Sequence, residues 1–174
     1  MGENSMRGTE LPLGVCSLSS LVHDLKPVHA AKSSGTVQLR VRYCECDPMG
    51  VAHHAAYIPW LEIGRTELLR DTGITYAQLE QAGVFLVIAK LDCRYRRPIF
   101  YDDLVEVRTK VVGGGRVKIQ HEYELALIED GQRGGGREPR NPGDVVFAAS
   151  STLGCVGADG KITTLPEWLV PSSQ

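Results

Sequence analysis

Asp47, Gly50, His53 and His54 lie close together in the stretch DPMGVAHH. A carboxylate can attack a carbonyl carbon or take a proton from water, and an imidazole titrates near neutral pH. Pro and Gly in the same stretch predict a turn, because proline presets one backbone angle and glycine frees another. Two interpretations of Asp47 follow: a reactive carboxylate held on a turn, or a turn residue that only bonds its own backbone.

A long helix follows this turn and must position it. Apolar or small residues recur at the spacing of one helical face, at Tyr57, Leu61, Gly64 and Leu68. The helix is expected from about His54 to Asp71, a length of roughly 27 Å, with Gly73 as its stop. Gly64 within it predicts that another element packs closely there.

The entrance of this helix has no ordinary cap. Between Pro48 and Tyr57 the sequence has no Ser, Thr, Asp or Asn to accept the N–H groups of the first turn. Proline is tolerated only in a first turn, so Pro59 places the start no earlier than about Ala55. We therefore expect the first N–H donors to be left for a ligand.

The rest of the chain is rich in strands. An alternating pattern starts at Thr36, and four later strands are expected around a short helix and a glycine turn. The strands are 84–98, 104–112, 117–128 and 144–156, the short helix is 76–81, and the turn is 113–115. This is an α+β layout in which an antiparallel sheet wraps one long central helix.

Domain organisation follows from where these patterns begin and end. Residues 1–35 have no sustained period beyond a short amphipathic piece at 18–25, and we expect a mobile N-terminal extension. Residues 36–170 form the domain, whose apolar tail at 165–169 can dock on the body. Residues 129–143 are a long loop rich in Gly, Pro and Arg.

Composition excludes several classes of protein. A net charge of −2 and a pI of about 6.2 argue against a dedicated nucleic-acid binder. No run approaches the roughly 18 apolar residues that cross a bilayer, and no secretion signal is evident. The five cysteines are odd in number and scattered, so reduced thiols and a cytoplasmic location are expected.

A metal site is not expected from the residues that could form one. Alternate cysteines on a strand, Cys44 and Cys46, share a face, and zinc binds Cys and His. The neighbouring His53 and His54 diverge at a helix start, however, and no C-x-x-C pair exists. The sequence therefore predicts no metal.

A resemblance now adds to these observations. The chain resembles hotdog-fold acyl-CoA thioesterases of the 4-hydroxybenzoyl-CoA thioesterase-like family over about residues 37–156. The positions that carry the resemblance are Tyr43, Glu45, Asp47, Gly50, His53, His54, Tyr57, Trp60, Glu62, Arg65, Glu67, Leu69 and Arg70, with Tyr95–Pro98 and Asp102–Leu104 downstream. It implies a five-stranded sheet around the helix, and an acyl-CoA substrate hydrolysed without a metal or redox cofactor. It also implies homodimers with active sites at their interface, and often homotetramers built as dimers of dimers.

The resemblance implies roles for particular residues. Asp47 matches the catalytic carboxylate, as nucleophile or general base, and the backbone N–H of His54 matches the group that polarises the thioester carbonyl. Gly50, His53 and Tyr57 are supporting residues, although Tyr57 also fits simple packing. Glu62 either faces inward as a supporting residue, or forms an ion pair with Arg65 or a hydrogen bond that orients the loop.

A basic set on the strand at 84–98 is the candidate for contacting CoA phosphates: Lys90, Arg94, Arg96 and Arg97. Arginine suits phosphate through its planar donor fork. The alternative is that these residues only solvate the end of a strand.

The sequence leaves two other functions open. An acyl-CoA hydratase of the same fold would carry a catalytic His about five places after the Asp, where this chain has Ala52. A non-catalytic acyl-CoA-binding protein is the second, and the joint presence of Asp47, Gly50 and His54 argues against it.

Overall fold

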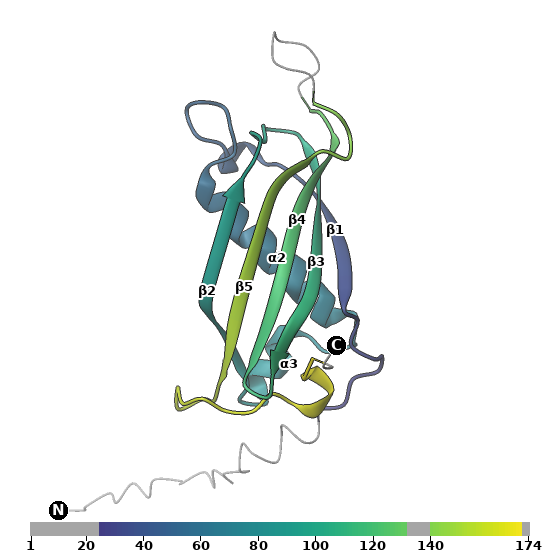
Figure 1. Ribbon diagram of the computed structural model, residues 1–174, viewed down its shortest axis with the longest axis vertical. Coiled ribbons are helices and arrows are strands. Elements are labelled where there is room, and N and C mark those ends of the chain that lie inside the picture. Colours follow the sequence, from purple (N-terminus) through teal and green to yellow (C-terminus); the bar gives the residue numbers. More distant parts are fainter. Residues whose placement is uncertain (1–24, 132–139, 172–174) are drawn as a thin grey trace, which may run out of the picture.

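The computed structural model describes residues 25–131 and 140–171. Five antiparallel strands form one sheet in the order β1-β3-β4-β5-β2. The strands are β1 Ser34–Arg40, β2 Phe85–Tyr95, β3 Leu104–Gly115, β4 Lys118–Glu129 and β5 Val145–Val156. A single long helix, α2 (Tyr57–Arg70), crosses one face of the sheet at an angle (Figure 1). The expected α+β hotdog architecture is confirmed.

The helix α2 has a start that differs from the expected one. It begins at Tyr57 and is preceded by a 3₁₀ turn, η2, over His54–Ala56. The tighter turn arises because the Ala56 N–H bonds the His53 carbonyl at 2.8 Å, three residues back. The helix ends as expected, with Gly73 at φ +87° after it.

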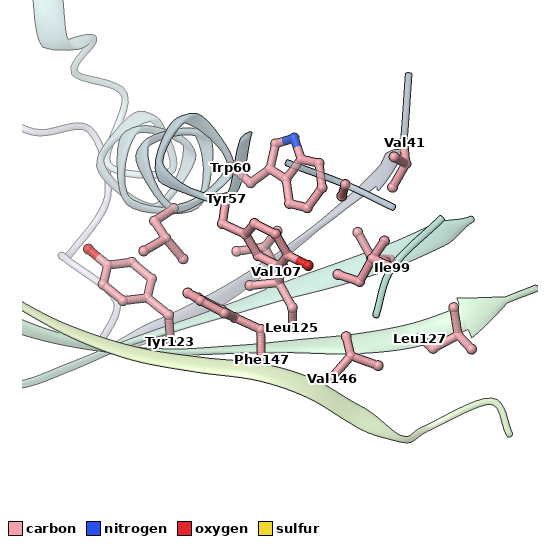
Figure 2. Close-up of a cluster of buried hydrophobic side chains, with 13 residues drawn as sticks. Val41, Tyr57, Trp60, Ile99, Val107, Tyr123, Leu125, Leu127, Val146 and Phe147 are labelled. Carbon is pink, nitrogen blue, oxygen red and sulfur yellow. The ribbon is translucent and has the colours of Figure 1, made fainter. Parts of the chain in front are cut away.

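The core lies between α2 and the sheet. The buried face of α2 consists of Tyr57, Trp60, Leu61, Gly64, Leu68 and Leu69. Figure 2 shows Tyr57 and Trp60 above side chains of the sheet, among them Val107, Leu125 and Phe147. These sheet residues are fully excluded from solvent, so their apolar burial is a main source of stability.

A second, smaller cluster closes the other end of α2. The short helix α3 (Tyr76–Gln81) has the predicted bounds, and Thr75 forms a capping box with Gln78 at its start. Leu79 of α3 is fully buried and packs with Val84. Leu165 joins this cluster at 5% exposure, so the apolar tail docks on the body as expected.

The glycine turn was misplaced by the sequence pattern. Gly113, Gly114 and Gly115 belong to β3 and pair with Gln120, Ile119 and Lys118. The chain reverses one step later, after a bulge between Val111 and Gly113. A side chain at Gly114 would meet the Lys118 carbonyl at 2.4 Å, so Gly114 allows the close approach of the two strands.

The segment before β1 packs against the end of α2. The N–H groups of Val28 and His29 bond the Thr72 carbonyl at 2.8 and 3.1 Å. Lys32 forms an ion pair with Asp71 at 2.7 Å. The amphipathic piece at 18–25 lies outside the described residues except for its last residue, Leu25.

A buried ion pair anchors the two ends of the long loop. Asp103 is fully buried and accepts N–H bonds from Phe100 and Gly131. Arg140 bonds both oxygens of Asp103, at 3.0 Å for Nη2–Oδ1, and also contacts Asp130. Because every oxygen of Asp103 has a partner, its charge is tolerated inside the protein.

Two further observations concern the described part of the chain. None of its helices is long and apolar enough to cross a bilayer, and α2 has only 14 residues. The four cysteines that fall within it, Cys44, Cys46, Cys93 and Cys155, are unpaired thiols.

Gly64 yields a test of the packing between α2 and the sheet. A Cβ at this position would lie 2.4 Å from Thr109 Oγ1 and 3.0 Å from Val107 Cγ1. Gly64→Ala is therefore expected to lower the free energy of unfolding by about 1–3 kcal/mol through overpacking, despite the better helix propensity of alanine. Urea denaturation measures the change.

Thr109→Ala provides the matched control, because it removes the nearest obstructing atom. The double variant Gly64→Ala/Thr109→Ala should recover part of the stability that Gly64→Ala loses. A Gly64→Ala protein that is as stable as the wild type would contradict the close contact.

Candidate functional site

A short hairpin carries both candidate catalytic groups. The His53 N–H bonds the Glu45 carbonyl at 2.8 Å, and the Asp47 N–H bonds the Val51 carbonyl at 2.9 Å. Between them Cys46 and Ala52 form an antiparallel bridge. The hairpin thus places Asp47 on one arm and the entrance of the helix at the end of the other.

Asp47 sits in the turn of this hairpin. Its Oδ1 accepts the Met49 N–H at 2.8 Å, and its carbonyl accepts the Gly50 N–H at 2.9 Å. Gly50 has φ +77°, which confirms the expected need for glycine. Asp47 is therefore a turn residue, as one interpretation proposed. Its second oxygen has no hydrogen bond within the described residues, so a carboxylate lone pair stays available on a half-buried side chain.

The helix entrance is partly capped, which corrects the expectation of an uncapped one. His53 Nδ1 accepts the Ala55 N–H at 3.2 Å, and its carbonyl accepts the Ala56 N–H. The His54 N–H has no acceptor in the part of the chain that the structure describes. One backbone donor is therefore left open at the positive end of the helical segment.

Glu45 organises the hairpin, although the sequence pattern assigned it no role. Its carboxylate accepts Trp60 Nε1–H from α2 at 2.9 Å and the Arg42 N–H at 2.7 Å, and it pairs with the Arg42 guanidinium. Burial raises its pKa, but the bonds from Arg42 and Trp60 outweigh burial and hold the pKa below its ordinary value. Its place in the motif, two residues before Asp47, was the available signal.

Two tyrosines support the helix entrance, Tyr57 from the core and the half-exposed Tyr95 from the edge strand β2. Tyr57 is 3% exposed and packs on Trp60, Tyr95 and Phe147, with ring centroids 4.8–5.0 Å apart. Burial raises its pKa to about 12, so it stays neutral. The Tyr95 hydroxyl donates to the His54 carbonyl at 3.1 Å. Tyr57 is thus a packing residue, and Tyr95 is a contact that the pattern did not reveal.

Glu62 does not face the interior. Its side chain is 61% exposed and pairs with Arg65 at 2.9 Å, so the ion-pair alternative is the one observed. Of the two partners, Arg65 is the more buried, at 15% side-chain exposure.

The four basic residues proposed for CoA lie along and just beyond β2, and all are exposed. Arg97 is engaged in an ion pair with Asp144 at 2.9 Å. Lys90, Arg94 and Arg96 form no ion pair with any described residue. Three of the four cations are therefore exposed without an ion-pair partner among the described residues.

Metal ligands do not gather in the described part of the chain. No group of three or more His, Cys, Asp or Glu side chains there has the arrangement to hold an ion.

Comparison with known proteins defines the class. A family model described as the Thioesterase-like superfamily matches residues 41–171. The chain belongs to this family, which confirms the resemblance to hotdog-fold thioesterases.

Named relatives agree with this assignment. "Putative acyl-CoA thioesterase YneP" of Bacillus subtilis is 33% identical over 88 residues, covering 51% of this chain and 64% of that protein. "Acyl-CoA thioester hydrolase YbgC" of Escherichia coli O157:H7 is 34% identical over 73 residues, covering 42% of this chain and 54% of that protein. The chain thus aligns with less than two thirds of the length of either relative.

Solved structures share the fold. A DHNA-CoA thioesterase from Staphylococcus aureus superposes with a TM-score of 0.64 at 26% identity, covering 76% of this chain and 80% of that one. The 4-hydroxybenzoyl-CoA thioesterase from Pseudomonas sp. strain CBS-3 gives 0.61 at 18% identity, covering 78% and 94%, and at that identity it supports the fold alone.

The lowered pKa of Glu45 makes the stability of the folded protein depend on pH. Its pKa is lower in the folded protein than the value of about 4.3 in an unfolded chain, so the unfolded state binds more protons in that range. The stabilisation by its carboxylate is present above pH 4.3 and is lost as the pH falls through the folded pKa. Glu45→Gln should show a flatter fall of the melting temperature between about pH 5 and 3.

Glu129→Gln is the matched control for this measurement. Glu129 also pairs with an arginine, Arg40, but its side chain is 46% exposed. The control should keep the wild-type dependence on pH. An equally steep fall in Glu45→Gln and in the wild type would show that Glu45 makes no such contribution.

Proposed function

We propose that this protein hydrolyses an acyl-CoA thioester to a free carboxylic acid and CoA. The observation that carries the proposal is the hairpin, which holds a carboxylate with a free oxygen and an open backbone N–H at the helix entrance. The names of the relatives support the substrate class. The exposed cations near β2 suit the phosphates of CoA.

Asp47 serves as nucleophile or as general base. As nucleophile, its oxygen bonds the thioester carbon, the C–S bond breaks, and the thiolate leaves and is protonated. Water then hydrolyses the resulting anhydride and regenerates the carboxylate. As general base, Asp47 takes a proton from the water that attacks the carbon, and that proton passes to the leaving thiolate.

The His54 N–H stabilises the negative charge that develops on the carbonyl oxygen. A backbone donor at a helix start is held in place before the reaction, so it costs no reorganisation when charge appears. The next two donors, the N–H groups of Ala55 and Ala56, are already bonded to the His53 imidazole and carbonyl. The His54 N–H is therefore the donor that stays free for the substrate.

The proposed active form is a homodimer. β2 is an edge strand in which Val87 and Ile88 are 45% and 44% exposed, and such an apolar edge favours pairing with a second copy. Pairs of dimers form the tetramer that the resemblance implies, in the cytoplasm where free thiols persist. Sedimentation of the purified chain as a monomer at micromolar concentration would oppose this assembly.

Asp47→Asn tests the chemical step. The amide can keep the turn by accepting the Met49 N–H, but it is a far weaker nucleophile and base. We expect the rate of CoA release in a thiol-reporting assay to fall at least about 100-fold, within the range of general-base contributions. Single-turnover hydrolysis in ¹⁸O water adds evidence on the role: label in Asp47 requires water to attack the Asp47 carbonyl of an anhydride, so its presence would demonstrate the nucleophilic route. Unchanged turnover with an intact fold would remove Asp47 from the mechanism, and acyl-CoA binding without hydrolysis in the wild type would favour a binding protein.

A pair of substitutions at His54 separates the backbone from the side chain within the same assay. His54→Ala keeps the N–H and should keep most activity. His54→Pro removes the N–H at a first helical position that tolerates proline, after His53 at ψ 139°, a value compatible with a following proline. Its kcat should fall about 10²–10³-fold. Equal activity of both variants would oppose the oxyanion role.

A further inference from the structure

A cavity of about 240 Å³ lies at the end of α2 remote from the hairpin. It is partly open to solvent and is lined by the second half of α2, the inner face of the sheet, the segment before β1 and the C-terminal tail. In Figure 1 this region lies toward the bottom, near α3 and the yellow tail. Arg65, which lines it, is about 12 Å along the helix axis from Tyr57.

Packed side chains separate this cavity from the hairpin. Tyr57, Trp60, Leu61, Tyr123 and Phe147 fill the space between α2 and the sheet, each at 3% exposure or less. Figure 2 shows Tyr57, Tyr123 and Phe147 in this position. The cavity is therefore a site of its own and not an extension of the catalytic hairpin.

Two buried polar atoms of the lining residues lack partners. His121 is 6% exposed, and its Nδ1 has no hydrogen-bond partner in the described chain. Trp168 Nε1–H of the tail is likewise unpartnered and buried. Burial, followed by the charge of Arg65, lowers the pKa of His121 to about 4, so its ring is neutral at pH 7. Such unpaired buried groups are costly unless a ligand or water bonds them.

The charges of the lining have one sign. Lys32 and Arg65 are its only charged members among the described residues, and no Asp or Glu lines it. The partner of Arg65, Glu62, lies at the surface with 61% of its side chain exposed. The lining hydroxyls of Thr72 and Tyr76 already donate to backbone carbonyls. The Arg65 guanidinium and the Trp168 indole N–H are donors, so a ligand with acceptor oxygens complements them.

We propose that this cavity binds an apolar monocarboxylate, with its carboxylate toward Arg65 and Trp168 and its hydrocarbon part against the aliphatic lining. A dry cavity of about 150 Å³ holds benzene, so the volume here suits about ten non-hydrogen atoms. A medium-chain fatty acid or an aryl carboxylate has this size. The inference does not depend on thioester hydrolysis, although that reaction would release the same class of molecule.

Calorimetry with octanoate on the purified full-length chain tests the site. Octanoate should bind, and octanamide, which has the same shape without the charge, should bind at least about tenfold more weakly. Arg65→Met and Trp168→Phe should each weaken octanoate binding by a similar factor, while the melting temperature without ligand confirms that each variant is folded. In NMR spectra the Trp168 indole N–H signal, assigned by its loss in Trp168→Phe, should shift on titration.

Glu62→Gln is the matched control for Arg65→Met. It breaks the same ion pair but keeps the guanidinium, so octanoate binding should be retained or strengthened. Asp47→Asn should bind octanoate like the wild type, which separates this site from the catalytic hairpin. Absence of binding at millimolar octanoate, equal binding of octanamide, or loss of binding in Asp47→Asn would each overturn the proposal.

Discussion

The end of the molecule that carries the candidate site depends on the hydrogen bonds of Glu45. The Glu45 carboxylate accepts the Trp60 indole N–H and so joins the hairpin to α2. The Glu45 backbone carbonyl accepts the His53 N–H. The loop that bears Asp47 and the start of the helix are therefore one unit. A partly buried carboxylate with several donors is a stable junction, since each bond to a charged group is stronger than a neutral one.

The long helix separates two different polar environments. At its entrance the His54 N–H has no acceptor among the described residues, and toward its far end a cationic side chain and unpaired ring nitrogens belong to the lining of a cavity. The aromatic core between them is packed without solvent exposure. This core keeps the two environments apart and fixes each by the same rigid element.

Periodicity and turn chemistry predicted most of the fold. The bounds of α3 and the succession of the strands along the chain followed from local pattern, because each of these segments has a face buried against its neighbours. The position of the β3–β4 reversal did not, since Gly113–Gly115 serve strand contact and not a turn. In the site, local sequence predicted the turn at Asp47 and Gly50. It missed the cap by His53, because imidazole is an unusual cap. It left the orientation of Glu62 open, and the structure shows the ion pair with Arg65 at the surface.

The pair formed by Arg140 and Asp103 has a consequence for how this chain can vary in length. It ties the two borders of the segment 132–139, Gly131 and Arg140, to Asp103 at the start of β3. Once borders are fixed in this way, doubling the number of intervening residues costs only about 0.6 kcal/mol of closure entropy. The connection between Gly131 and Arg140 is thus a place where evolution or engineering can insert residues while the strands and the hairpin keep their geometry.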